Sequence, residues 1–235
     1  MSLLNPVAAA LDATSRYLST VGALTDTQLR EPSLLPGWSR GHVVAHVALN
    51  AQGMARALRG LRTGEPVPVY DSREARNADI EARAGGSAEE LAGLSQLTCL
   101  KLAGELRLMK AIGEVELFPG GPVLDIAGLV EARWREVEVH HADLGLDYSP
   151  ADWSLPFAAH LLHTTAEDRG AEGIALTLHA RDLGETVMVG PGGHGVAGDA
   201  AAIAWWLVGR GDGSDLAVTR PLPTLGPWTR RTPAR

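Results

Sequence analysis

WREVEVHHADL, residues 134–144, carries Glu136 and two adjacent histidines within an apolar frame. Glu136 and His140 are four residues apart, so in a helix their side chains lie on one face, one turn apart. Such a pair is most often an ordinary polar helix face. It is also a suitable pair of metal ligands, because an imidazole nitrogen and a carboxylate oxygen both bind Zn²⁺ and similar divalent ions. A third ligand elsewhere in the chain would favour the metal site.

Working outward from this stretch, four segments with helical periodicity fill the first 145 residues. They cover residues 7–24, 39–61, 72–112 with a break at Gly85–Gly86, and 125–144. Ser39 and Ser87 are expected helix N-caps, and Glu90 completes a capping box with Ser87. Long helices joined by short or medium loops predict a four-helix bundle.

The pattern changes after LGLDYSPADW, residues 144–153. We expect a helix over 155–169, alternating strands within 173–182 and 186–190, a loop over 191–199, a helix over 200–210 capped by Asp199, and a short strand over 216–219. The predicted fold class is therefore α+β. Residues 1–148 are expected to form the bundle that carries the metal site, and residues 149–235 a small α+β domain.

His46 is the candidate for the third ligand. It lies in SRGHVVAHVALN, residues 39–50, within a run of valine, alanine and leucine. We expect it to face the bundle core, where an unpaired polar group is unfavourable. A hydrogen bond to a carbonyl or to water would explain it, but bundles also build metal sites from inward-facing residues of different helices. With Glu136 and His140 it makes three protein ligands, the pattern of catalytic zinc sites that keep an open position. His42, one turn earlier, is expected to be partly exposed.

Composition excludes several other classes of protein. The chain is 45% hydrophobic and 21% charged with a formal net charge of −7, and no cluster of Lys and Arg indicates nucleic-acid binding. Cys99 is the only cysteine, so no intrachain disulfide is possible, and its apolar helical surroundings predict a buried thiol. No apolar run reaches the roughly 20 residues that span a bilayer, and the N-terminus lacks the basic region of a signal peptide. We expect a cytoplasmic protein without nucleic-acid or membrane partners.

Several stretches resemble the mycothiol-dependent maleylpyruvate isomerase family. They are LLPGWSRGHVVAHVALNA (34–51), TGEPVPVYDSREARNADIE (63–81), REVEVHHADLG (135–145) and LVGRGDGSD (207–215), so the resemblance covers nearly the whole chain. It implies a DinB-like four-helix bundle with a smaller C-terminal α/β domain. It also implies zinc ligands at His46, Glu136 and His140. The family's functional arginines fall on Arg76, within EARN, and on Arg210.

Two positions depart from the family pattern. His141 stands where the family has a small residue, and Glu138 where a large apolar or aromatic residue is expected. His141 is about 100° around the helix from His140, so we expect it at the rim or surface rather than on the same ion. Asp143 is either an acceptor for an imidazole N–H or an ordinary polar residue near the helix end.

The resemblance implies a cis–trans isomerase that converts maleylpyruvate, or a similar ring-cleavage dienoate from aromatic degradation, to fumarylpyruvate by reversible thiolate addition. The implied cofactors are Zn²⁺ or another divalent metal and mycothiol or a related low-molecular-weight thiol. The thiol is expected to come from a cofactor because Cys99 is expected to be buried. Arg76 and Arg210 are expected to bind the dicarboxylate substrate. We expect a monomer. Two alternatives stay open: a mycothiol S-transferase on the same scaffold, which the arginine of EARN disfavours, and a metal-binding bundle without catalysis.

Overall fold

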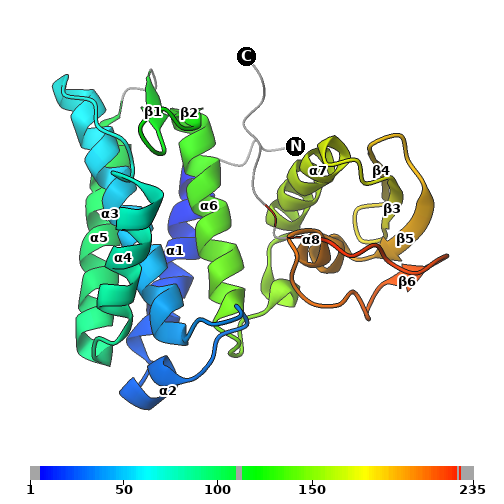
Figure 1. Cartoon of the computed structure of the whole chain (residues 1–235), viewed down its shortest axis with the longest axis horizontal. Coiled ribbons are helices and arrows are strands. Elements are labelled where there is room, and N and C mark those ends of the chain that lie inside the picture. Colours follow the sequence, from blue (N-terminus) through cyan, green and yellow to red (C-terminus); the bar gives the residue numbers. More distant parts are fainter. Residues whose placement is uncertain (1–5, 110–112, 227, 229–235) are drawn as a thin grey trace. The chain divides into compact units, whose positions relative to one another are not determined.

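A computed structural model describes residues 6–109, 113–226 and 228, and the chain divides into two compact units, Met1–Asp147 and Tyr148–Arg235 (Figure 1). The first unit is mostly helical, whereas the second combines helices with a four-stranded sheet. The predicted α+β class with a helical N-terminal part is confirmed. Among the described residues, no helix is both long and apolar enough to cross a membrane.

Four long helices form the first unit. They are α1 (Pro6–Gly22), α3 (Arg40–Thr63), α5 (Ala88–Leu108) and α6 (Ile126–Asp143). Helix α3 packs mainly against α5, and α1 packs mainly against α6, with further contacts between α1 and α5 and between α3 and α6. This is the predicted bundle. Two shorter helices, α2 (Asp26–Arg30) and α4 (Arg73–Ala84), contact α3.

The predicted helix starts are confirmed by their hydrogen bonds. The Ser39 side chain caps α3, and His42 returns the contact through its ring, with Nδ1 3.2 Å from the Ser39 backbone nitrogen. Ser87 and Glu90 form the expected capping box of α5. The expected segment 72–112 is two helices, α4 and α5, separated at Gly85–Gly86 as predicted, and its last residues, 110–112, lie outside the described ones.

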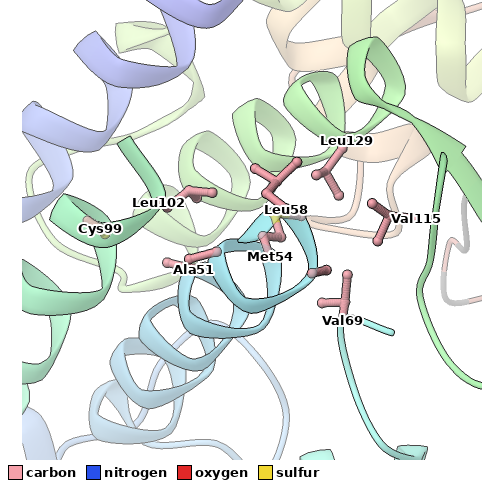
Figure 2. Close-up of a cluster of buried hydrophobic side chains, with 10 residues drawn as sticks. Ala51, Met54, Leu58, Val69, Cys99, Leu102, Val115 and Leu129 are labelled. Atoms are coloured by element: carbon pink, nitrogen blue, oxygen red, sulfur yellow. The ribbon is translucent and has the colours of Figure 1, made fainter. Parts of the chain in front are cut away.

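A hydrophobic cluster joins three bundle helices to two segments outside them (Figure 2). Its buried members are Ala51, Met54, Ala55, Ala57, Leu58, Val69, Cys99, Leu102, Val115 and Leu129. Each large aliphatic side chain contributes about 1.5–3 kcal/mol when fully buried. Cys99 is buried as predicted. Because Val69 belongs to the cluster, the segment that precedes α4 is anchored on the bundle.

A hairpin that the sequence did not predict holds the same segment. Strands β1 (Glu114–Glu116) and β2 (Val123–Asp125) pair antiparallel. The backbone nitrogens of Val69 and Tyr70 donate to the carbonyls of Glu116 and Leu117, at 2.9 and 3.0 Å. On the other side, a Cβ at Gly53 of α3 would lie 2.4 Å from the Val69 carbonyl oxygen, so only glycine allows this close approach. The backbone at Tyr70 is therefore fixed from two sides.

The second unit contains a short 3-10 helix, η1 (Pro150–Asp152), then α7 (Leu155–Ala171), β3 (Leu176–Ala180), β4 (Glu185–Val189), β5 (His194–Gly198), α8 (Ala200–Leu207) and β6 (Ala217–Val218). The sheet order is β4-β3-β5-β6, with β3 and β5 parallel and the other pairs antiparallel. The expected helix over 155–169 and the strands in 173–182, 186–190 and 216–219 are confirmed.

Three predictions for this unit were wrong. Residues 191–199 are not all loop, because they contain β5, whose backbone pairs with β3 on one side and β6 on the other. The helix expected over 200–210 ends at Leu207, and Gly209 adopts a positive φ of 78° soon after it. Asp199 precedes α8 but its side chain makes no capping bond. The Asp182 side chain instead accepts from the Ala200 backbone nitrogen at 2.8 Å.

Candidate metal centre

Three predicted ligands meet between α3 and α6. His46 comes from α3, and Glu136 and His140 come from α6, with one potential ligand atom of each lying within 4.8 Å of the others. Glu136 Oε2 is 2.9 Å from His46 Nε2 and 3.5 Å from His140 Nε2. The two imidazole rings meet edge to face, with centroids 4.7 Å apart. We call these three residues the triad.

The triad's spacing fits a single divalent ion. Bonds of about 2.0–2.1 Å in tetrahedral geometry separate neighbouring ligand atoms by roughly 3.3–3.5 Å. The 3.5 Å from Glu136 Oε2 to His140 Nε2 lies in this range, and the 2.9 Å to His46 Nε2 is shorter. This oxygen is buried, and the Nε2 atoms of His46 and His140 face it. Burying a carboxylate oxygen is unfavourable unless a hydrogen bond or a cation satisfies it. Two nitrogens and one oxygen are also a donor set that zinc and related metals accept.

The protonation states favour metal binding as well. Burial lowers the pKa of His46 to about 4, although the Glu136 carboxylate opposes part of this shift. At neutral pH His46 is therefore an uncharged imidazole, the form that ligates metals. Burial by itself raises the pKa of Glu136, but the neighbouring His46 and His140 outweigh it and hold that pKa well below its usual range. The carboxylate is therefore ionised.

Asp143 orients one of the ligands. Its side chain is fully buried, and Oδ2 lies 2.8 Å from His140 Nδ1. An ionised carboxylate only accepts, so His140 Nδ1 carries a proton and donates it. This leaves Nε2, 3.5 Å from Glu136 Oε2, as the ring atom that could ligate a metal. The hydrogen bond from His140 Nδ1 confirms one of the two interpretations of Asp143, that it accepts from an imidazole N–H.

Arg76 of α4 lies beside the triad. Its Nη2 is 3.2 Å from His46 Nδ1, and its guanidinium stands 5.6 Å from the centre of the Tyr70 ring. Arg210 belongs to the second unit, just after α8, where its Nη1 donates to the Val208 carbonyl at 3.0 Å. The predicted role of Arg210 in substrate binding stays a prediction.

A buried chain of hydrogen bonds near the triad was not predicted from the sequence. Arg133 of α6 donates to Asn50 of α3 at 2.9 Å, and the Asn50 amide nitrogen donates to the Tyr70 hydroxyl at 3.1 Å. Burial raises the pKa of Tyr70, and the nearby negative charge of Glu136 raises it further. The phenol is therefore protonated at neutral pH. Helical spacing could have indicated that these residues lie near the triad, because Asn50 follows His46 by four residues and Arg133 precedes Glu136 by three.

The two departures from the family pattern lie on another face of α6. His141 is 2% exposed, which makes its expected rim or surface position wrong. Its Nε2 is 2.8 Å from the Thr20 hydroxyl of α1, and its ring meets Tyr17 edge to face. Glu138 is also buried and pairs with Arg16 of α1 at 2.8 Å. Helix α1 covers this face, so both residues belong to the α1–α6 contact.

Fold and site together define a helical bundle with a two-histidine, one-carboxylate cluster between two of its helices. Residues 10–145 match the family described as Mycothiol maleylpyruvate isomerase N-terminal domain. This match spans more than half of the sequence, and the chain belongs to the mycothiol maleylpyruvate isomerase family. The resemblance inferred from the sequence is confirmed.

Solved structures extend the similarity to both units. The crystal structure of the mycothiol-dependent maleylpyruvate isomerase has a TM-score of 0.88 and 26% sequence identity to this chain, over 97% of this chain and 98% of that one. A crystal structure of a histidine-to-alanine mutant of the mycothiol-dependent maleylpyruvate isomerase has a TM-score of 0.87 with the same identity and coverage. No curated protein matches the chain.

Proposed function

We propose that this protein is a thiol-dependent cis–trans isomerase that converts maleylpyruvate to fumarylpyruvate, with a divalent metal ion and mycothiol as cofactors. The observation that carries the proposal is the triad of His46, Glu136 and His140 with Arg76 beside it. Membership of the family and the similarity to the mycothiol-dependent maleylpyruvate isomerase support the choice of reaction.

Isomerisation requires that the substrate double bond lose its double character for a moment. The cis double bond becomes single when a thiolate adds to the carbon that is β to the conjugated ketone. The displaced electron pair moves onto the ketone oxygen as an enolate. Rotation then brings the chain to the trans arrangement, and the pair returns as the thiolate leaves. No atom is gained or lost overall, so one thiol serves many turnovers.

The triad would hold the metal through His46 Nε2, His140 Nε2 and a Glu136 oxygen. A divalent ion with an open position acts as a Lewis acid and favours the thiolate form of a bound thiol at neutral pH. Asp143 keeps the His140 lone pair directed at this position through the 2.8 Å bond to Nδ1. The Cys99 thiol is buried and contacts Arg133 in the bundle interior, so it does not replace an external thiol.

Arg76 is the proposed carboxylate-binding residue of the first unit. A guanidinium only donates hydrogen bonds, so in its contact with Arg76 the His46 Nδ1 atom is the acceptor. A neutral imidazole that ligates through Nε2 carries its proton on Nδ1 and no longer accepts there. Metal binding would thus free Arg76 for a substrate carboxylate, which it suits as a planar, two-pronged donor. Arg210 is the proposed second carboxylate-binding residue.

Turnover should depend on a thiol. Purified protein is mixed with maleylpyruvate and with mycothiol, glutathione or no thiol, and fumarylpyruvate is quantified by chromatography. We expect formation of the trans product to rise with mycothiol concentration and saturate, with mycothiol fully recovered, and to fall to the protein-free rate without thiol. The glutathione arm measures selectivity for the thiol. An equal rate without thiol would contradict the proposal, and accumulation of a stable thiol conjugate would indicate an S-transferase instead.

A further inference from the structure

A hydrogen-bond chain of fixed direction starts at a buried arginine in the bundle. Arg133 is 2% exposed, and its Nη1 lies 2.9 Å from Asn50 Oδ1 and 3.0 Å from the Val47 carbonyl oxygen. Because a guanidinium has donors but no acceptor, the Asn50 atom that faces it must be the amide oxygen. Of the two orientations that the Asn50 amide could adopt, only the one with the oxygen toward Arg133 is compatible with this contact.

The direction of the chain continues to Tyr70. With its oxygen on Arg133, Asn50 presents its amide nitrogen to the Tyr70 hydroxyl at 3.1 Å. An amide nitrogen only donates, so the phenol oxygen is the acceptor in this bond. The phenol proton takes no part in it and stays available for another acceptor.

Several contacts keep the Tyr70 side chain beside the metal centre. Its ring stacks on Phe118 at 5.4 Å between centroids, and the Arg76 guanidinium stands against the ring. The Tyr70 backbone is bonded to the hairpin. Tyr70 and Arg76 also line one open pocket of about 70 Å³ bordered by α3 and α4. Tyr70 and Arg76 thus border the same pocket, and Arg76 also contacts His46.

We propose that the Tyr70 hydroxyl donates a hydrogen bond to the enolate oxygen of the substrate, and that Asn50 and Arg133 are positioning residues that direct its proton there. This inference rests on the proposed function. The oxygen of the conjugated ketone gains negative charge when the thiolate adds and loses it when the thiolate leaves. A neutral donor that stays protonated stabilises this charge without consuming a proton.

Two substitutions separate the donor role from a structural one. Tyr70→Phe removes the hydroxyl but keeps the ring on Phe118. Asn50→Asp keeps the hydroxyl but replaces the amide donor with a carboxylate, which accepts from Arg133 and from the phenol, so the phenol proton turns away from the substrate. Tyr17→Phe is the matched control, because Tyr17 is a buried bundle tyrosine whose hydroxyl has no partner among the described residues.

The experiment measures three quantities on the metal-loaded full chain. They are the metal content, the kinetic constants kcat and KM for maleylpyruvate at saturating mycothiol, and the Kd for 2,4-dioxopentanoate, which is measured by calorimetry. This diketo acid mimics the enolate half of the adduct. We expect both Tyr70→Phe and Asn50→Asp to lower kcat about 100-fold, with KM changed less than about threefold. Binding of the diketo acid should weaken about tenfold. Metal content should be unchanged, and Tyr17→Phe should behave as wild type.

Two results would overturn the inference. One is Tyr70→Phe protein that binds the diketo acid as tightly as wild type. The other is Asn50→Asp protein that keeps the wild-type Kd and kcat, because the hydroxyl would then serve only packing. If Asn50→Asp fails to fold, Tyr70→Phe decides alone. If wild type does not isomerise maleylpyruvate while Tyr70→Phe weakens diketo-acid binding, the proposed function fails and the donor assignment stands.

Discussion

Replacing His46 with alanine is expected to remove the metal ion and to lower thiol-dependent turnover by about 10³-fold or more, because metal assistance contributes several kcal/mol to the transition state. His46 is the only triad member from α3, so its loss leaves two ligands on one helix. Metal per chain is measured by elemental analysis, and turnover by formation of fumarylpyruvate. One ion per chain retained in His46→Ala protein would contradict the ligand assignment.

Two further variants, one as a control and one with a smaller expected effect, accompany His46→Ala. His42→Ala removes a histidine one turn earlier on the same helix, whose ring contacts Ser39 and Glu81 rather than the triad, so metal content should be unchanged. Asp143→Asn removes the carboxylate that accepts from His140 but none of the ligands. It should weaken metal affinity by about 10–100-fold and still reach one ion per chain at high metal concentration.

Replacing Arg76 with alanine is expected to lower kcat/KM for maleylpyruvate by about 100-fold, since removing one partner of a desolvated charged hydrogen bond costs roughly 2–5 kcal/mol. Arg76→Lys keeps the charge but loses the planar pair of donors, so its activity should lie between alanine and wild type. Metal content should not change in either variant, because Arg76 donates and cannot ligate.

Arg73→Ala is the matched control for Arg76. Arg73 lies one turn earlier on α4 and is exposed, with its guanidinium 4.6 Å from the centre of the Phe118 ring. The same change of charge on the same helix should leave kcat/KM within about threefold of wild type, as is usual for exposed surface positions. Steady-state kinetics at saturating mycothiol give the comparison. Equal losses in the Arg76 and Arg73 variants would show that net charge, and not a specific contact, is responsible.

The triad could be predicted because it depends on local rules. Four-residue spacing places Glu136 and His140 on one helix face, and the apolar run around His46 turns that residue toward the core. A bundle of long amphipathic helices then leaves few places where the two faces can meet. The helix starts at Ser39 and Ser87 were equally local, because a capping side chain bonds to a backbone amide three residues later.

The features that were missed depend on partners far away in the sequence. The β5 strand is short and contains two glycines, and it becomes a strand only because β3 and β6 offer backbone groups on both sides. His141 is buried because α1 covers that face of α6, and the spacing within α6 does not contain this information. The role of Tyr70 needs the amide of Asn50 and the charge of Arg133, which lie 20 and 63 residues away in the sequence.

Metal titration of the stripped protein tests the central claim most directly. Chelator-treated protein is titrated with Zn²⁺ in the presence of saturating mycothiol, and turnover of maleylpyruvate is plotted against bound metal per chain. Turnover should rise in proportion to bound metal and stop rising at one ion per chain, and His46→Ala protein should show no rise. Full mycothiol-dependent turnover in the metal-free protein would contradict the assignment of His46, Glu136 and His140 as the metal centre of the reaction.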